Sequence, residues 1–534
     1  MSADTVSDPV VGWPAPLRQA LAAPFGSIPE MVALNARLRG DHAALVLDGA
    51  QGLQVLGYAA LDRQVERVAA ALRRDGLRAG DCIALCAATS LPYVVTYLGA
   101  ARAGVVVAPL PPSATAAQLA GLAANAGARC LFTDAEVAAL WPADAALARV
   151  LLDDGAPGKR WSDWLAEPGA VPGAGAAQLS PQAPFNIIYS SGTTGVPKGI
   201  VQSCGMRWAQ LQRAPASGFG PDAVTLLALP LYSNLTLTNL LGALGLGGTV
   251  VLLARFDAGR YLALAAQQRA THSVLVPVQF RRLLDHTDFA RTDLSALRRK
   301  FSAGAPFAAA LKAEVLRRWP GELTEYYGLT EGGGRTELPA HRFPDKLGTI
   351  GRPSAGNDIR VIDEQGRELG PHAVGELVGH SATMMSGYHG LPEQTRAAEW
   401  FDAQGKRFIR TGDIGRFDAD GFVVLVDRRK DMVISGGFNL YPSDLEAVLQ
   451  QHPAVAEAAV TGVASLRWGE TPVAFVVLRR GADIDAPALR AWANERLGKS
   501  QRLADLVLVA QLPRSEVGKV LKRQLRDGFD RPVP

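Results

Sequence analysis

One loop in the sequence combines glycines, hydroxyl side chains and a lysine in a spacing suited to holding phosphate. It runs Tyr189-Ser190-Ser191-Gly192-Thr193-Thr194-Gly195-Val196-Pro197-Lys198-Gly199 and follows the apolar run 185–189, which predicts a strand. Glycines let a backbone approach an anion closely, and successive N–H groups can form an anion-binding nest. The hydroxyls add donors and the lysine adds a positive charge. We therefore expect phosphate to be bound by Ser190, Ser191, Gly192, Thr193, Thr194, Gly195 and Lys198.

This loop is not a Walker phosphate loop. Lys198 follows Pro197 rather than glycine, and it precedes Gly199 rather than serine or threonine. A flexible turn would explain the composition of the loop equally well, and only the complete string favours a phosphate site. Other charged residues are as ambiguous by themselves: Glu331 could be an ordinary surface acid, and Lys519 lies in a basic tail.

Five motifs in order remove this ambiguity, because together they resemble the adenylate-forming superfamily of acyl-CoA synthetases, peptide-synthetase adenylation domains and luciferases. The resemblance runs from about Ile28 to Arg523. After the phosphate loop, the motifs are Tyr326-Tyr327-Gly328-Leu329-Thr330-Glu331, Arg410-Thr411-Gly412-Asp413, Asp427–Asp431 with Ser435-Gly436-Gly437-Phe438-Asn439, and Pro513–Lys519. Two departures are mild: Ile409 stands where an aromatic residue is frequent, and Ala303 stands where glycine is frequent.

The resemblance implies a role in adenylation for each motif. Thr330 would help to hold phosphate, and Glu331 would bind the Mg²⁺ that bridges ATP oxygens, since Mg²⁺ commonly uses one or two carboxylates plus phosphates. Asp413 would accept hydrogen bonds from both ribose hydroxyls, and Arg428 would reach the ribose or a phosphate. Lys519 would be the catalytic lysine, because a carboxylate attacking the α-phosphate brings two anions together. Further nucleotide contacts would come from Gly304, Ala305, Pro306, Tyr327 and Gly328.

The same resemblance implies a second half-reaction with coenzyme A. In the family the small domain rotates after adenylation, and Lys430 lies at the matching hinge position. Gly436 and Gly437 would let a pantetheine arm pass close to the backbone, where a Cβ atom would intrude. Trp468 resembles a tryptophan that packs on CoA in related ligases, although an ordinary, partly buried aromatic residue is an equally good interpretation. The expected cofactors are ATP, Mg²⁺ and coenzyme A.

The resemblance places the acid pocket at the segment 230–235. Ser233 stands where acyl-CoA synthetases often have histidine, and Asn234 matches an asparagine of aryl-acid-activating members. With Tyr232 and Gly332, these are the predicted substrate residues, and the glycines at 332–334 would leave space beside the pocket. An alternative for Asn234 is the N-cap of a helix over residues 235–244, because asparagine is preferred there. The pattern favours an aromatic acid, and a medium-chain or alicyclic acid stays open.

Alternating helical and strand-like patterns must position these motifs. A helical pattern over 58–74 precedes short apolar runs at 82–86, 105–108 and 130–132, and the rhythm resumes at 225–229, 249–253, 273–276 and 300–302. Strands separated by helices predict βαβ units and a parallel sheet. From Gly351, shorter alternating strands predict a small β subdomain, and an α+β segment follows the charged run at 427–431. We expect an α/β fold, with an AMP-binding domain over 1–429 and a small, mobile α+β domain over 430–534.

Composition excludes several other classes of protein. A chain of 534 residues exceeds one hydrophobic core. A net charge of +4 does not suggest nucleic-acid binding, and no segment reaches the roughly 20 apolar residues of a membrane span. No secretory signal is visible, and the cysteines form no Cys-x-x-Cys pair, which indicates free thiols in a reducing cytoplasm. These cysteines are Cys82, Cys86, Cys130 and Cys204.

The sequence therefore predicts an ATP-dependent carboxylic acid–CoA ligase, an AMP-forming acid–thiol ligase. It would form an acyl-adenylate with release of pyrophosphate, and then a thioester with release of AMP. Its partners would be a small-molecule carboxylic acid and CoA, with no nucleic acid and no membrane span, and a homodimer is compatible with the sequence. Two alternatives stay open: a stand-alone enzyme that loads a carrier protein, and a catalytically silent nucleotide-binding homologue, against which the intact Lys519, Glu331 and Asp413 argue.

Overall fold

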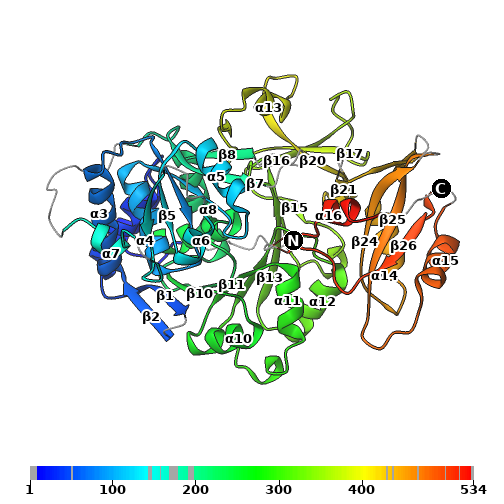
Figure 1. Ribbon diagram of the computed structural model, residues 1–534, viewed down its shortest axis with the longest axis horizontal. Helices are drawn as coiled ribbons and strands as arrows, with labels where there is room; N and C mark the ends of the chain where they lie inside the picture. Colours follow the sequence, from blue (N-terminus) through cyan, green and yellow to red (C-terminus); the bar gives the residue numbers. More distant parts are fainter. Residues whose placement is uncertain are drawn as a thin grey trace.

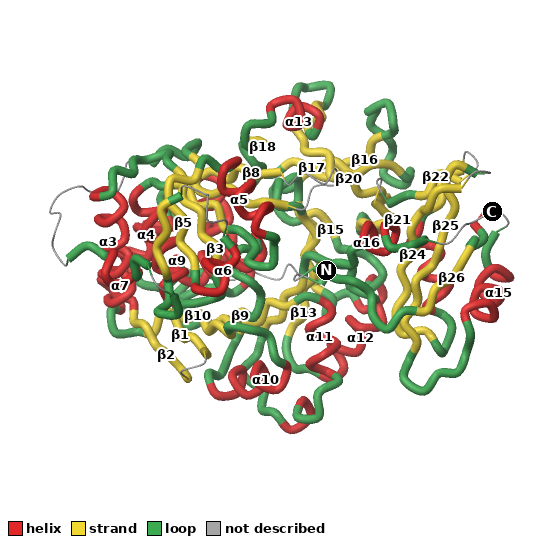
Figure 2. Tube along the Cα trace, viewed as in Figure 1, coloured by secondary structure: helices red, strands yellow, loops and turns green. Residues whose placement is uncertain are grey.

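The computed structural model describes most of the chain, and its sheets form a large lobe and a smaller one (Figure 1). The described residues are 9–49, 52–141, 147–156, 158–167, 179–190, 198–428, 431–435, 438–465, 468–498, 501–515 and 518–530. Secondary structure along the chain is drawn in Figure 2.

The first sheet has seven strands in the order β18-β8-β7-β4-β3-β5-β6. Its strands are β3 (Cys82–Cys86), β4 (Val106–Pro109), β5 (Ala128–Thr133), β6 (Ala148–Leu151), β7 (Pro184–Ser190), β8 (Lys198–Ser203) and β18 (Gly387–Tyr388). Helix α3 (Tyr58–Arg74) precedes β3. The helices between the strands are α4 (Leu91–Ala103), α5 (Ala116–Asn125), α6 (Ala135–Leu140) and α7 (Trp161–Trp164), and α8 (Cys204–Arg213) follows β8. Strands β3 to β7 are parallel where they pair, whereas β8 and β18 join antiparallel.

The second sheet has nine strands in the order β15-β14-β13-β12-β11-β9-β10-β1-β2. Its strands are β1 (Ala43–Gly49), β2 (Gly52–Gly57), β9 (Val224–Leu227), β10 (Thr249–Leu253), β11 (His272–Leu275), β12 (Arg299–Ser302), β13 (Glu322–Gly328), β14 (Arg335–Pro339) and β15 (Arg352–Pro353). The accompanying helices are α1 (Ala15–Leu21), α2 (Ile28–Arg39), α9 (Asn234–Gly245), α10 (Ala258–Gln267), α11 (Pro277–Leu284) and α12 (Ala309–Arg318), with 3₁₀ turns at Ala214–Ser217, Phe289–Arg291 and Pro344–Lys346. The parallel βαβ pattern is confirmed for its centre, while β2, β14 and β15 are antiparallel strands that the sequence did not predict.

Two smaller sheets complete the fold. The predicted β subdomain contains β16 (Asp358–Ile362), β17 (Gly375–His380), β19 (Glu399–Phe401), β20 (Arg407–Phe417) and β21 (Val423–Arg428), with helix α13 (Pro392–Ala397). The C-terminal segment contains β22 (Val433–Ser435), β23 (Phe438–Leu440), β24 (Val455–Ser465), β25 (Gly469–Leu478) and β26 (Asp505–Leu508), with helices α14 (Pro442–Gln450), α15 (Ala486–Arg496) and α16 (Lys522–Asp527). An α+β segment after the charged run was expected, and it is present.

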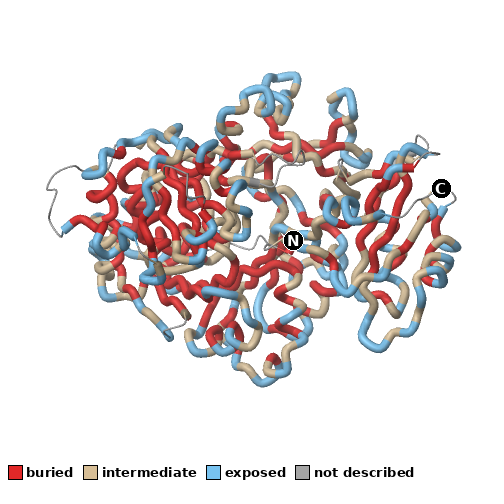
Figure 3. Tube along the Cα trace, in the orientation of Figure 1, coloured by how far each residue is buried: buried red, intermediate tan, exposed pale blue. Residues whose placement is uncertain are grey.

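The main core lies between the first two sheets, where buried residues from both sheets and from α2, α3, α4, α8 and α9 form one cluster (Figure 3). Helices α3 and α4 approach each other closely at Gly99, where an added Cβ would lie 2.5 Å from the Cβ of Val68. Glycine is therefore required at that crossing. The C-terminal segment has its own apolar clusters on its sheet.

Two findings bear on the predictions from composition. None of the helices described here is long and apolar enough to cross a membrane. The four cysteines are free; Cys130 is partly exposed and the other three are buried.

Candidate active site

The motifs of the second sheet gather at the carboxyl ends of its parallel strands, where α/β sheets bind ligands. The segment 230–234 follows β9, and Val276 follows β11. Gly304 follows β12, and the loop with Thr330 and Glu331 follows β13. Because β9, β11, β12 and β13 pair in parallel register, these four loops meet at one edge.

The predicted phosphate loop joins β7 to β8. Its residues Ser191, Gly192, Thr193, Thr194 and Gly195 lie outside the described residues, as does the side chain of Ser190. The two strands pair up to the base of the loop, where Ser190 is opposite Lys198. The Lys198 ammonium lies 4.9 Å from the centre of the Tyr388 ring.

Tyr388 connects the base of this loop to the predicted magnesium ligand. Its hydroxyl donates to Oε1 of Glu331 at 3.0 Å. Burial, with a further contribution from Glu331, raises the pKa of Tyr388, so the phenol stays protonated and can donate. Tyr388 thus contacts both residues, with Lys198 over the face of its ring and Glu331 at its hydroxyl.

The surroundings of Glu331 fit a magnesium ion held partly by phosphate. No group of three potential metal-binding side chains occurs in the part of the chain that the structure describes. A dedicated protein cage for a metal is therefore not present among those residues. One carboxylate beside a phosphate loop is the arrangement that Mg²⁺ uses with nucleotides.

Asp413 is the most constrained acid of the site. Its carboxylate accepts a hydrogen bond from the hydroxyl of Tyr327 at 2.6 Å and lies 2.9 Å from Nε of Arg428. Its backbone N–H donates to Oγ1 of Thr411 at 3.0 Å. The residue is 3% exposed, and β20 places it opposite Arg428 on β21.

The neighbours of Asp413 keep their protons. Burial, and then the Asp413 carboxylate, raise the pKa of the Tyr327 phenol. Burial works against the charge on Arg428, but Asp413 together with Tyr327, Asp431 and Glu331 outweighs it, and the pKa of the guanidinium rises. A carboxylate offers about four lone-pair sites, so these two contacts leave one on each oxygen. That remaining capacity matches the two hydroxyls of a ribose.

The predicted adenine loop is open to solvent at its centre. Gly304 is exposed and has φ +88°, a conformation that favours glycine, with open space where a Cβ would stand. Ala305 is partly buried and Pro306 is exposed. Gly328 ends β13 on the same side, also exposed. Before this loop, the hydroxyl of Ser302 is buried without a hydrogen-bond partner.

The predicted acid pocket lies at the start of α9. Tyr232, Ser233 and Asn234 are partly buried. Ser233, not Asn234, occupies the N-cap position, and no side-chain capping bond is present. The N-cap interpretation of Asn234 was therefore wrong, because the helix begins one residue earlier than its apolar pattern. The Oδ1 of Asn234 is buried without a hydrogen-bond partner.

Gly332 does not leave open space, contrary to the sequence interpretation. It has φ +73°, and an added Cβ would stand 1.6 Å from the carbonyl oxygen of Thr383. The glycine instead allows the loop after Glu331 to pack on the segment between β17 and β18. Met385 in that segment donates its N–H to the carbonyl of Glu331 at 2.8 Å.

The C-terminal segment reaches this edge through the loop of Lys519. An added Cβ on Gly518 would lie 3.2 Å from Cγ1 of Val278 and 3.4 Å from Cγ2 of Val276, so the loop touches the large lobe beside α11. The N–H of Lys519 donates to Oγ of Ser515 at 3.1 Å, and the lysine is exposed.

The predicted CoA residues lie elsewhere or are not described. Lys430, Gly436 and Gly437 lie outside the described residues. Strands β22 and β23, on either side of the two glycines, pair with each other, and β22 pairs with β25 at Ser435 and Gly469. Trp468 is next to that pairing and is 44% exposed. In Figure 2 this end of the sheet points away from the large lobe.

Sequence reasoning missed a buried hydrogen-bond chain behind the site. Gln202 donates to the carbonyl of Thr330 at 2.9 Å, Asn186 donates to Gln202 at 3.0 Å, and Nε of Arg207 donates to Asn186 at 3.0 Å. The available signal was polar residues inside otherwise apolar strands. Tyr388 was missed as well, because nothing near it in the sequence links it to Glu331.

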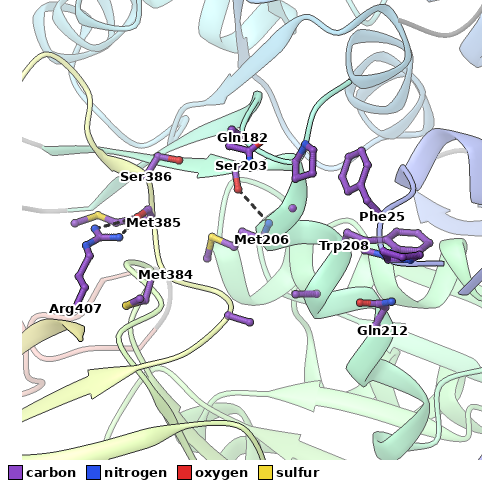
Figure 4. Close-up of a pocket in the computed structure, with 15 residues that line it drawn as sticks. Phe25, Gln182, Ser203, Met206, Trp208, Gln212, Met384, Met385, Ser386 and Arg407 are labelled. Carbon is purple, nitrogen blue, oxygen red and sulfur yellow. Dashed lines mark hydrogen bonds between the residues drawn. The ribbon is translucent and has the colours of Figure 1, made fainter. Parts of the chain in front are cut away.

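An open surface pocket of about 460 Å³ lies on the outer side of α8 (Figure 4). Its lining includes Phe25, Met206, Trp208, Met384 and Met385. None of the predicted site residues lines it, although Met385 in its wall is bonded to the backbone of Glu331.

Comparisons with known proteins agree with this geometry. The model of the AMP-binding enzyme family matches residues 32–389, and that of the AMP-binding enzyme C-terminal domain matches residues 444–519. The chain therefore belongs to the AMP-binding enzyme family.

Individual relatives make the likeness more specific. The chain is 33% identical to a 4-coumarate–CoA ligase-like protein (number 9) of Oryza sativa subsp. japonica, over 95% of this chain and 94% of that protein. It is 33% identical to a feruloyl-CoA synthase of an Amycolatopsis species, over 91% and 96% of the two chains. The solved amide bond synthetase McbA of Marinactinospora thermotolerans has a TM-score of 0.81 and 30% identity, over 94% and 99%.

Proposed function

We propose that this protein is an ATP-dependent carboxylic acid–CoA ligase. A carboxylate oxygen of the acid attacks the α-phosphorus of ATP, and pyrophosphate leaves with the electrons of the broken P–O bond. The sulfur of CoA then attacks the acyl carbon, the thiol proton is lost, and AMP leaves. The relatives named 4-coumarate–CoA ligase-like protein and feruloyl-CoA synthase, similar over nine-tenths of this chain or more, support this assignment.

One observation carries the adenylation step: a buried carboxylate whose remaining acceptor capacity suits a ribose lies on the same edge as Glu331. Asp413 is fixed by Tyr327 and Arg428, so it meets a nucleotide without rearranging. Such fixed polar groups cost no reorganisation during reaction. Thr330, beside Glu331, has its carbonyl held by Gln202.

Different charged residues neutralise the two anions that react, the carboxylate of the acid and the phosphates of ATP. Lys198 and the loop before it hold the phosphates. Glu331 would hold Mg²⁺, which supplies positive charge to the phosphate oxygens when bound. Lys519 neutralises the acid and the α-phosphate, and the contact of its loop with Val276 and Val278 supports this position.

The thioester step uses a second arrangement of the C-terminal segment. The domain boundary at residues 429–430 and the hinge role of Lys430 are parts of this proposal. The loop of Lys519 would then leave the site. Its place would be taken by the end of the sheet that carries Trp468, together with the segment containing Gly436 and Gly437. The exposure of Trp468 supports a surface that meets a ligand in another arrangement.

The acid is proposed to be aromatic. The relatives are named for coumarate and ferulate, which supports an aryl acid. The unpartnered Oδ1 of Asn234 supports a polar contact at the pocket entrance. A cytoplasmic location is supported by the four free cysteines. A homodimer stays a prediction from the sequence.

An acid panel tests the function. Purified protein is incubated with ATP, Mg²⁺ and each acid, with and without CoA, and pyrophosphate, AMP and thioester are measured separately. We expect pyrophosphate release that depends on the acid, and thioester with AMP only when CoA is present. Thioester on a phosphopantetheinylated carrier but not on CoA would favour the carrier-loading alternative, and no acid-dependent pyrophosphate release would favour the silent homologue.

A further inference from the structure

Arg207 on α8 is a buried cation without an acidic partner among the residues that the structure describes. It is 2% exposed. Its Nε donates to Asn186, and its Nη1 donates to Gln210 at 3.0 Å and to Thr238 at 3.1 Å. These three partners are neutral. By contrast, the buried Arg102 is paired with two acids, Asp62 and Glu66.

The guanidinium is only partly satisfied. Arginine has five N–H donors, and the contacts above use one on Nε and two on Nη1. Nη2 is buried without a hydrogen-bond partner. A buried donor without an acceptor destabilises the folded state by the free energy of its lost hydration. A buried charge without a partner destabilises it more.

A second unpartnered donor lies beside the first. The hydroxyl of Tyr97 on α4 is buried beside Arg207 and interacts with it, and its proton has no acceptor among the described residues, because a guanidinium only donates. Tyr93, one turn earlier on α4, also has a buried, unpartnered hydroxyl and interacts electrostatically with Tyr97 and with Tyr232. Burial raises the pKa of the Tyr93 and Tyr97 phenols, to about 12 for Tyr97, so both hydroxyls keep their protons and can donate.

These donors adjoin the acid pocket. Thr238, which accepts from Arg207, lies one turn after Asn234 and donates to the carbonyl of that residue at 2.9 Å. Within the otherwise buried α9, the side chains of Asn234, Leu235, Thr238 and Asn239 remain partly exposed and form one helical face. Arg207 and Tyr97 therefore lie behind the pocket face of α9, about 6 Å beyond its start.

We propose that Arg207 and Tyr97 form a subsite for an oxygen acceptor at the end of the acid remote from its reacting carboxylate. The substrate class is therefore an acid with a distal hydroxyl or second carboxylate. Gln210, whose side chain is partly exposed, holds Nη1 with a neutral amide oxygen in the free protein. The distal oxygen of the substrate accepts hydrogen bonds from Nη2 and from the Tyr97 hydroxyl. The described residues provide no acceptor within hydrogen-bond distance of these two donors. The inference rests on the proposed ligase function.

The test compares matched acids that differ only at the distal end. The probes are 3-phenylpropanoate, 3-(4-hydroxyphenyl)propanoate and 3-(4-carboxyphenyl)propanoate, with heptanoate and heptanedioate as an aliphatic pair. In each series we expect the oxygen-bearing acid to have the higher kcat/KM in acid-dependent pyrophosphate release, on the order of tenfold to hundredfold. The hydroxyl and carboxylate arms distinguish the two sources of the acceptor.

Three variants assign the preference to the subsite. Tyr97→Phe removes only an unpartnered hydroxyl, so it should keep or raise Tm while lowering the preference about tenfold. Arg207→Met removes the charge and should abolish the preference, and Arg207→Lys should restore part of it. The control Tyr58→Phe removes a buried hydroxyl that donates to the carbonyls of Leu244 and Gly248, so it should lower Tm and leave the ranking of acids unchanged.

The outcomes separate this inference from the proposed function. Thioester formation without any preference for distal oxygen in the wild type would overturn the subsite alone. A preference that survives in both folded Tyr97→Phe and Arg207→Met would also overturn it. Absence of thioester with every acid would overturn the proposed function.

Discussion

A reversible cross-link between Val276 and Gly518 would hold the Lys519 loop where the structure places it. An ideal Cβ on Gly518 lies 3.8 Å from the Cβ of Val276, which equals the mean Cβ separation of about 3.8 Å in natural disulfides. The double variant Val276→Cys/Gly518→Cys should therefore oxidise without moving the backbone. The two residues belong to the large lobe and to the C-terminal segment, so the bond joins the parts that must separate for the second step.

The energetic terms favour formation of this bond. Gly518 has φ +79°, so a cysteine there costs roughly 1–2 kcal/mol of backbone strain. Closing a loop of more than 100 residues stabilises the folded chain by about 5 kcal/mol in the chain-entropy model. The net effect is a raised Tm for the oxidised protein and a slightly lowered Tm for the reduced one.

The assay measures the two half-reactions separately. The oxidised double variant should retain acid-dependent ATP–pyrophosphate exchange, because Lys519 stays at the site. It should form thioester at least about tenfold more slowly than the same protein after reduction. Each single variant, oxidised and reduced in parallel, controls for strain at either position and for the four native thiols. Thioester formation at equal rates before and after reduction would refute the need for the C-terminal segment to leave this position.

Three further changes test separate parts of the site, and a fourth tests a buried lysine of β12. Asp413→Asn should raise KM for ATP in pyrophosphate exchange, by roughly ten- to hundredfold, since hydrogen bonds to a charged group contribute about 1.5–3 kcal/mol; an unchanged KM would remove the ribose assignment. Lys519→Ala should slow acyl-adenylate formation by roughly 100-fold or more while transfer from a pre-made acyl-adenylate to CoA survives, and equal losses would count against its role in one half-reaction. Gly437→Leu should slow thioester formation while pyrophosphate exchange persists; collapse of both would make the glycine structural. Burial lowers the pKa of Lys300 to about 7, so the folded state binds fewer protons than the unfolded state between pH 7 and 10. In that range the free energy of unfolding of the wild type should rise by about 1.4 kcal/mol per pH unit relative to Lys300→Met. Parallel curves of Tm against pH for the two proteins would contradict this.

Local patterns in the sequence identified the parts of the site that one loop supplies. The segment before Lys198 and the loop at Thr330 and Glu331 each follow a strand, so their position at a strand end could be predicted, whereas Asp413 lies inside β20 and was identified by its motif. The partners of these residues could not. Tyr388 reaches Glu331 only because β18 pairs with β8, and sheet order of this kind leaves no local pattern.

The errors at Asn234 and Gly332 have physical causes that local reasoning does not contain. The apolar pattern of α9 starts after the helix itself does, so the cap was placed one residue late. Gly332 is required by a carbonyl of Thr383, which lies in the segment between β17 and β18 and is 51 positions away in the sequence. Both corrections depend on packing between elements that are distant along the chain.

In the free protein, polar groups at both ends of the proposed site lack hydrogen-bond partners. At the ribose end the unused groups are acceptors, and at the acid end they are donors. Asp413 has its carboxylate fixed by two donors and keeps acceptor capacity, which suits hydroxyl groups that donate. Arg207 and Tyr97 are fixed by acceptors or by packing and keep donors, which suit an oxygen that accepts. Leaving such groups unsatisfied destabilises the free protein, and a ligand that completes them regains this free energy on binding. The acid end should therefore discriminate between substrates more sharply than an apolar pocket of the same size, because an acid without the distal oxygen leaves the donors buried and unpaired.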